Sequence, residues 1–194
     1  MKKLLFTVLI LFSVSLAFAQ VRAGIKIGSN LSTFSNDVHP KMKFGYHVGG
    51  FLDFTLNENL SLQPELLYSK QGANFEAVSI SLGYVNVPVL LKINIVKNFS
   101  AEIGPQVGYL LSAKQVIDKE KVTITYPGQP ININTNIKEQ YKDIDVTAIA
   151  GLSYMFTENI VVSARYGFGL TQLHKKNIVK SQNSVIQLSV GYKF

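Results

Sequence analysis

The chain has 194 residues, a formal net charge of +7 and no cysteine. Its length suffices for one domain with a sizeable core. The lack of cysteine excludes a disulfide-stapled scaffold. Beyond the first twenty residues, no segment approaches the roughly 18 consecutive apolar residues that indicate a transmembrane helix. Stability must therefore come from burial and backbone pairing.

Residues 1–19 have the features of a secretory signal peptide. Two lysines precede an apolar stretch over 4–16, and Ala17-Phe18-Ala19 is a small-x-small cleavage site. The stretch is short for a membrane anchor, and no basic stop-transfer cluster follows it. We expect cleavage after Ala19, which leaves 20–194 as the mature domain. Since the peptide removes two lysines and no acidic residue, the net charge falls from +7 to +5. A soluble exported protein and a membrane barrel both remain open.

Eight segments of the mature chain alternate between apolar and polar residues with a period of two, which indicates β-strands. Around position 145, for example, Ile144 and Val146 alternate with Asp145 and Thr147. Helical periodicity is weak everywhere. In chain order the segments cover about 21–33, 43–56, 59–71, 80–95, 99–112, 144–156, 160–171 and 184–194.

Short and long connections alternate between these segments. The short ones are 57–58, 96–98 and 157–159, and the long ones are about 34–42, 72–79, 113–142 and 172–183. In a meander with both termini on one side, every short turn falls on that side. The sequence therefore predicts an all-β fold, an eight-stranded antiparallel up-and-down transmembrane β-barrel with short periplasmic turns and long external loops.

Strand length and aromatic placement support a membrane barrel. Most segments have ten residues or more, as membrane-crossing strands need, whereas soluble strands usually have about five or six. Outward aromatic residues form two girdles, as two membrane interfaces would favour. One girdle, near the short turns, comprises Phe54, Phe99, Phe156, Tyr192 and Phe194, and the other comprises Tyr46, Tyr68, Tyr109, Tyr166 and Phe168.

The opposite faces of the strands carry charges of both signs. Eight strands close a barrel just wide enough for side chains to fill it. Isolated buried charges are costly, so we expect a packed, hydrogen-bonded polar network and not an open channel. A proton or ion path is the alternative. The predicted network comprises Lys26, Asp53, Glu65, Lys92, Glu102, Asp145, Arg165 and Lys193.

Three prolines lie inside predicted strands: Pro64, Pro88 and Pro105. Each removes one hydrogen bond from the strand ladder, and a closed barrel has no edge strand where that loss is harmless. We therefore expect bulges or local breaks in pairing at these positions.

Four motifs contain the three prolines or lie in the predicted strands around them: "GIKIGSNLSTF" at 24–34, "LQPELLYSKQG" at 62–72, "YVNVPVLLKINI" at 84–95 and "EIGPQVGYLLSA" at 102–113. Together they resemble the motifs of PorT-like outer-membrane β-barrel proteins from Bacteroidetes. The resemblance implies a barrel in the cell outer membrane, with a link to envelope or secretion processes. The last strand, ending at Phe194, also resembles the terminal signal read by the outer-membrane assembly machinery.

The sequence predicts a structural or interaction protein and not an enzyme. It offers no cofactor motif and no metal constellation, because cysteine is absent and the three histidines are widely spaced. A lipid-A-directed enzyme using His174 with Ser112 and Asp143 is one alternative. A soluble periplasmic ligand-binding barrel is another, and it would need the apolar faces to point inward.

The external loops carry the predicted contacts. His174, Lys175, Lys176 and Lys180 crowd the last loop and are predicted to face lipopolysaccharide phosphates. Nucleic acid is excluded by the export signal. The 113–142 loop alternates again over 122–126 and 131–137, which predicts a projecting hairpin around 127–130. Such a hairpin would offer a protein partner an unpaired edge.

Overall fold

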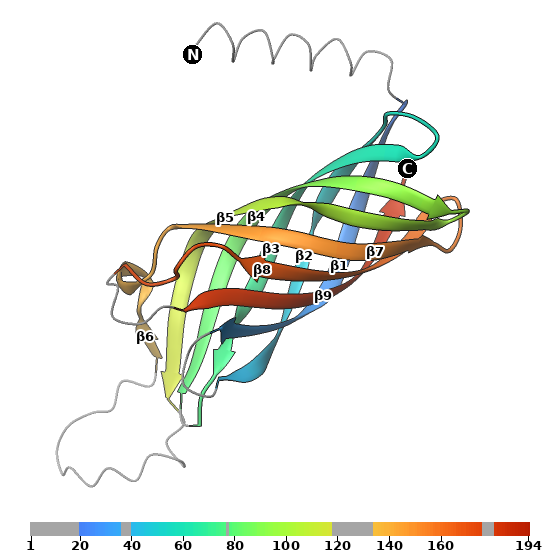
Figure 1. The fold of residues 1–194 in the computed structure, drawn as a ribbon. Helices are drawn as coiled ribbons and strands as arrows, with labels where there is room; N and C mark the ends of the chain where they lie inside the picture. Colours follow the sequence, from blue (N-terminus) through green and yellow to red (C-terminus); the bar gives the residue numbers. More distant parts are fainter. Residues whose placement is uncertain (1–19, 36–39, 77, 118–133, 176–180) are drawn as a thin grey trace, which may run out of the picture.

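The computed structural model describes residues 20–35, 40–76, 78–117, 134–175 and 181–194. Within them, eight long antiparallel strands close into one barrel, and a short strand extends the wall at one end (Figure 1). Each long strand pairs with its chain neighbours, and β1 with β9 completes the circle. The long strands are β1 (Gln20–Ser35), β2 (Lys41–Thr55), β3 (Leu60–Asn74), β4 (Val78–Val96), β5 (Phe99–Ile117), β7 (Ile144–Met155), β8 (Ile160–Gly169) and β9 (Gln182–Lys193). The predicted eight-stranded antiparallel barrel is confirmed.

Two small elements follow β5. Strand β6 (Asn134–Asn136) pairs with residues 114–116 of β5, and the 3-10 helix η2 (Lys138–Gln140) comes next. The predicted hairpin tip at 127–130 lies outside the described residues. No helix in the described ranges is long and apolar enough to span a membrane.

The short turns lie at the barrel end that holds the last residues of β9. They comprise 56–59, 97–98 and 156–159, close to the predicted positions. Asn98 has a φ of 68°, so the two-residue turn at 97–98 uses a left-handed asparagine, as tight hairpins prefer. The prediction of a long link at 72–79 is wrong. Because β3 runs to Asn74 and β4 begins at Val78, only 75–77 remain between them.

The barrel wall is apolar outside and polar inside over most of its height. Outward side chains such as Phe44, Leu66 and Ile103 are more than half exposed, whereas the inward Lys26 and Arg165 are 3% exposed. The tyrosines and phenylalanines of both predicted girdles lie on the outward faces. A soluble barrel would need the opposite arrangement, so this alternative is excluded.

Pairing is interrupted next to the prolines without a change of register. Between β3 and β4, residues 65–66 and 87–88 are unpaired, and pairing resumes from Pro64↔Val89 to Leu67↔Asn86 in the same register. Between β4 and β5, residues 89–90 and 104–105 are unpaired. The predicted breaks are confirmed. Register shifts occur elsewhere, between Met42 and His47 of β2 and at Gly83 of β4.

Near the long-loop end the two faces of the strands exchange their polarity. Along β4 the inward residues change from Asn86 to Tyr84 and Leu82, while the outward residues change from valines to serines. The inward residues there join an apolar cluster that we call the cap: Phe34, Ala73, Leu82, Tyr84, Leu110, Ala113, Ile137, Tyr141 and Leu173. Since Ile137, Tyr141 and Leu173 come from the connections, the cap draws those segments into the barrel mouth.

Candidate functional site

A network of buried charges crosses the middle of the barrel. The Arg165 guanidinium on β8 donates two hydrogen bonds of 2.9 Å to the Glu65 carboxylate on β3. In the circular strand order these two strands are four apart in either direction, so they are diametrically opposite. Arg165 Nε also donates to Glu102 Oε2 over 2.5 Å. A bidentate guanidinium–carboxylate pair is among the strongest polar contacts, so this bridge spans the lumen as a rigid strut.

Two lysines complete this network. Lys26 Nζ donates to Glu65 Oε1 over 2.7 Å, and Lys92 Nζ lies 3.4 Å from Glu102 Oε1. Gln63 accepts a hydrogen bond from Lys92 and donates one to Glu65. Each carboxylate thus meets at least two cationic side chains, as buried charges require.

The remaining sequence-predicted charges lie at the two ends of the lumen. Asp53 on β2 and Lys193 on β9 form an ion pair close to the short turns. Asp145 on β7 lies toward the cap, apart from any cationic partner among the described residues, and accepts a hydrogen bond from Thr171. The structure therefore brings five of the eight predicted residues into one network, pairs two more, and leaves Asp145 separate.

A layer of neutral side chains lies between the network and the cap. His47 contacts Asn30 Oδ1 over 2.7 Å and Ser189 Oγ over 2.8 Å. Asn30 and Gln71 both donate to Ser69, and Asn183 donates to Gln71. His47 is buried and lies two residues from the inward Gly45 and Gly49 in the alternation of β2. Its amide partners could not be predicted, because asparagine and glutamine carry no charge signal in the sequence.

The outer rim carries basic residues just above the aromatic girdle. The Tyr46 and Tyr68 rings lie 6.2 Å apart on β2 and β3. Three residues farther along β2, Lys43 donates to Ser79 Oγ over 2.5 Å and lies within electrostatic range of Lys70. No ion pair of Lys43 or Lys70 occurs within the described residues. Two like charges are therefore held together at the membrane boundary.

The predicted site in the last loop is only partly described. The His174 ring lies 4.6 Å from the Tyr141 ring, and Lys175 Nζ lies 3.8 Å from Asp143 Oδ2. Lys176 and Lys180 lie outside the described residues. With Asn136, Lys138 and Glu139, the Lys175–Asp143 pair lines a polar pocket of about 440 Å³. No group of three or more histidine or acidic residues in the described ranges could hold a metal.

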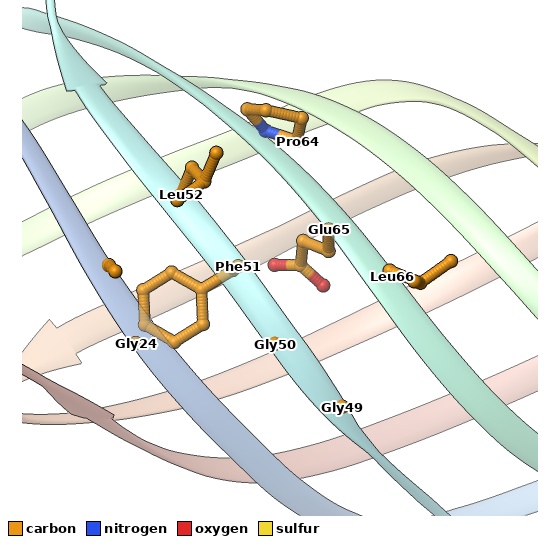
Figure 2. Close-up of a pocket in the computed structure, with 9 residues that line it drawn as sticks. Gly24, Gly49, Gly50, Phe51, Leu52, Pro64, Glu65 and Leu66 are labelled. Carbon is orange, nitrogen blue, oxygen red and sulfur yellow. The ribbon is translucent and has the colours of Figure 1, made fainter.

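An apolar depression of about 610 Å³ lies across β1, β2 and β3. Figure 2 shows the bare backbone of Gly49 and Gly50 beside the Pro64 and Leu66 side chains of the next strand. A Cβ atom on Gly49 would lie 2.0 Å from the Leu66 carbonyl oxygen, so β2 and β3 approach too closely there for any other residue. The depression is thus a thin part of the wall.

Solved structures that resemble this chain include barrels of two bacterial proteins. Neisserial surface protein A superposes with a TM-score of 0.58 and 11% identity, over 89% of this chain and 97% of that one. Ail, the attachment invasion locus protein of Yersinia pestis, superposes with a TM-score of 0.53 and 16% identity, over 90% of this chain and 99% of Ail. The structure of Ail in complex with the heparin analogue sucrose octasulfate superposes with a TM-score of 0.53 and 18% identity, over 90% of this chain and 99% of Ail. No curated protein matches the chain significantly.

The family comparison agrees with the fold. Residues 18–175 match the model of the outer membrane protein beta-barrel domain. The match covers seven of the eight long strands completely and includes the lumen network except Lys193. The charged interior, the apolar outer wall and this match lead to one assignment: the chain belongs to the outer membrane protein beta-barrel family and lies in the outer membrane.

Proposed function

We propose that this protein is a non-conducting outer-membrane barrel that acts by binding at its external surface. In this proposal residues 1–19 are a signal peptide cleaved after Ala19, and 20–194 form the working domain. The observation that carries the proposal is the Arg165–Glu65 bridge, which joins opposite walls of the barrel at 2.9 Å. A side-chain strut across a narrow barrel occupies the cross-section that water and ions would need.

Two further layers support a sealed interior. The cap closes the external mouth with apolar side chains, which ions do not cross without a large desolvation cost. The neutral layer below it links His47 to Asp145 through the Ser69 hydroxyl and the amides of Asn30, Gln71 and Asn183. A primary amide does not titrate near neutral pH, so this route does not serve as a proton relay.

The external rim supplies a binding surface. The Lys43 ammonium donates to the Ser79 hydroxyl and lies within electrostatic range of Lys70, near the rim that carries Tyr46 and Tyr68. Phosphate is the anion that lysine and hydroxyl donors bind at a membrane surface, so we propose that this rim contacts lipopolysaccharide phosphates. The predicted loop site at His174, Lys175, Lys176 and Lys180 would extend the same contact. Because Asp143 pairs with Lys175, we propose binding and not lipid-A chemistry at this rim.

A protein partner is proposed for the 113–142 region. Strand β6 continues the barrel wall beyond β5 over 134–136, and its other edge has no strand partner within the described residues. Strand addition to such an edge needs no change in the barrel. With the PorT-like motifs, this edge supports a role in envelope or secretion processes, after insertion by the outer-membrane assembly machinery.

Conductance tests the sealed interior. The purified folded barrel should give no current steps in planar lipid bilayers at either polarity. The variant Arg165→Ala, if folded, should give small steps only when it is combined with Leu173→Ala, because the cap still closes the external mouth after the strut is removed. A wild-type protein that conducts ions would contradict the proposal.

Binding to lipid vesicles tests the rim. Vesicles that contain lipid A should sediment the wild-type barrel in detergent-depleted buffer more strongly than vesicles of neutral lipid alone. The double change Lys43→Gln and Lys70→Gln should remove most of this difference. Lys97→Gln, at the opposite end of the barrel, is the matched control and should have no effect. Equal binding by the double variant would contradict the assignment of this rim.

A further inference from the structure

Asp145 differs from the other three acidic residues of the lumen. Glu65, Glu102 and Asp53 each form an ion pair with lysine or arginine. The Asp145 side chain is as deeply buried, at 5% exposure, yet no ion pair of Asp145 occurs in the described parts of the chain. A buried carboxylate without a counter-charge carries a large desolvation cost, so its environment must compensate in another way.

Neutral groups from β7, from β9 and from the connection after β8 converge on this carboxylate. Thr171 Oγ1 donates to Asp145 Oδ1 over 2.6 Å, and Thr147 Oγ1 donates to Oδ2 over 3.4 Å. The Asn183 side chain also hydrogen-bonds to Asp145, while its Nδ2 donates to Gln71 Oε1 over 2.5 Å.

Several oxygens around Asp145 are buried and have no hydrogen-bond partner. They are Asn183 Oδ1, Gln106 Oε1 and Tyr84 Oη. Asn183 touches Asp145 directly, Gln106 pairs in register with Thr147, and Tyr84 lies within electrostatic range of Asp145. All three side chains are more than nine-tenths buried. Buried polar atoms are rarely left unsatisfied, and these three oxygens outnumber the one unpaired amide nitrogen nearby, Asn86 Nδ2, so the unpaired atoms favour a ligand with positive charge.

The surroundings isolate this group from the other charges. Above it lies the apolar cap, which contains no charged side chain. Below it, the neutral layer of Asn30, Ser69 and Gln71 separates it from the central network. No lysine or arginine therefore reaches Asp145 from either side in the described residues.

We propose that Asp145 binds a small monovalent cation such as sodium. The ligands are the Asp145 carboxylate and the neutral oxygens of Thr147, Thr171 and Asn183, with Gln106 and Tyr84 at the edge of the site. Hard cations prefer oxygen ligands, and one carboxylate balances one positive charge. A divalent ion would leave a net charge in a site with no second carboxylate. The bound cation replaces the missing lysine or arginine.

The test compares thermal stability in different salts. The folded barrel in detergent is heated in sodium chloride or in N-methylglucamine chloride at constant ionic strength, and the unfolding midpoint is read from the gel mobility shift. A ligand that binds only the folded state raises this midpoint. We expect sodium to raise the wild-type midpoint by at least about 2–4 °C, and Asp145→Asn to remove the difference. Asp53→Asn breaks the ion pair with Lys193 and is the matched control. It should lower the unfolding midpoint in both salts and leave the difference between the two salts unchanged.

Further measurements keep the test decisive if Asp145→Asn fails to fold. Thr171→Val removes one neutral ligand and should raise the half-saturating sodium concentration about ten-fold, the effect of roughly one lost hydrogen bond. Crystals soaked in thallium chloride should show an anomalous peak beside Asp145. Equal wild-type midpoints in both salts would overturn the proposal. So would a stabilisation produced by acid instead of sodium, or by calcium at far lower concentration than sodium.

Discussion

Arg165 and Glu65 stand on diametrically opposite strands, and two parallel hydrogen bonds of 2.9 Å join their side chains across the whole lumen. Neither strand pairs with the other, so this contact is independent of the barrel ladder. It braces the barrel across its diameter at mid-height, in addition to the ladder, whose strand number and stagger set that diameter.

The bridge should dominate the stability of the barrel interior. Glu65→Gln leaves Arg165 and Lys26 without their shared carboxylate, and we expect it to reduce the free energy of unfolding by about 3–5 kcal/mol. Urea unfolding in detergent, followed by gel mobility, measures this loss. Lys175→Gln breaks the exposed pair with Asp143 and should cost less than about 1 kcal/mol. Similar losses for the two variants would show that the interior network contributes little.

The cap should hold the external connections in place. Leu173 is 3% exposed, and its backbone bonds to Lys142 and Ser181. We expect Leu173→Ala to destabilise the cap by about 2–5 kcal/mol and to speed tryptic cleavage at Lys138 and Lys142. Leu170→Ala, on the outward face three residues earlier, is the control and should leave cleavage unchanged. If both variants are cleaved at the wild-type rate, the cap does not anchor these segments.

Gly49 should tolerate no side chain. A Cβ there would lie 2.0 Å from the Leu66 carbonyl oxygen and 2.8 Å from Leu67 Cα, both backbone atoms that move only if the strand moves. We expect Gly49→Ala to abolish or sharply reduce the heat-modifiable form. At Gly50 the nearest atom is a carbonyl oxygen at 3.4 Å, so Gly50→Ala should assemble normally. Normal assembly of Gly49→Ala would mean that β2 and β3 separate more easily than this geometry implies.

Phe194 should matter for assembly more than for packing. Its ring is 69% exposed and contacts Tyr192, while its backbone N–H donates to the Ala23 carbonyl over 2.9 Å. Phe194→Ala keeps that hydrogen bond and loses little buried area, so any large defect must arise before folding is complete. We expect less folded barrel in the outer membrane but normal thermal stability of the fraction that folds. Phe156→Ala, at 70% exposure near the same end, is the control. Equal yields for both variants would argue against a terminal assembly signal.

The sequence predicts the barrel because period-two alternation is a local signal. Residues such as Lys26 and Arg165 could be placed inside from parity alone, since a strand sends alternate side chains to opposite faces. The partners could not be predicted in this way. Glu65 meets Arg165 because the barrel closes, and no local pattern in either strand encodes the register of strands four places apart.

The cap was missed for a related reason. Along β4 the residues alternate on both sides of Tyr84, but the alternating apolar set changes from the even positions 78–84 to the odd positions 85–95. A test that looks only for alternation does not register this change of phase. The error at 72–79 has the same origin, because residues with mixed polarity there were interpreted as a loop although they extend β3 and β4. A comparison of the two ends of each strand, asking whether the apolar residues fall on odd or on even positions, would have found both the cap and the extension of β3 and β4.

The exchange of polarity also bears on how this scaffold can be changed. On the short-turn side of this exchange the outer face of the wall is apolar and contacts lipid. On the long-loop side the outer face is polar and contacts water, as in a small soluble protein. The segment that joins Ile117 to Asn134 therefore starts and ends on a base with its own apolar core. A foreign peptide grafted between those residues would be displayed at the cell surface on a rigid stem, with little strain passed to the barrel beneath.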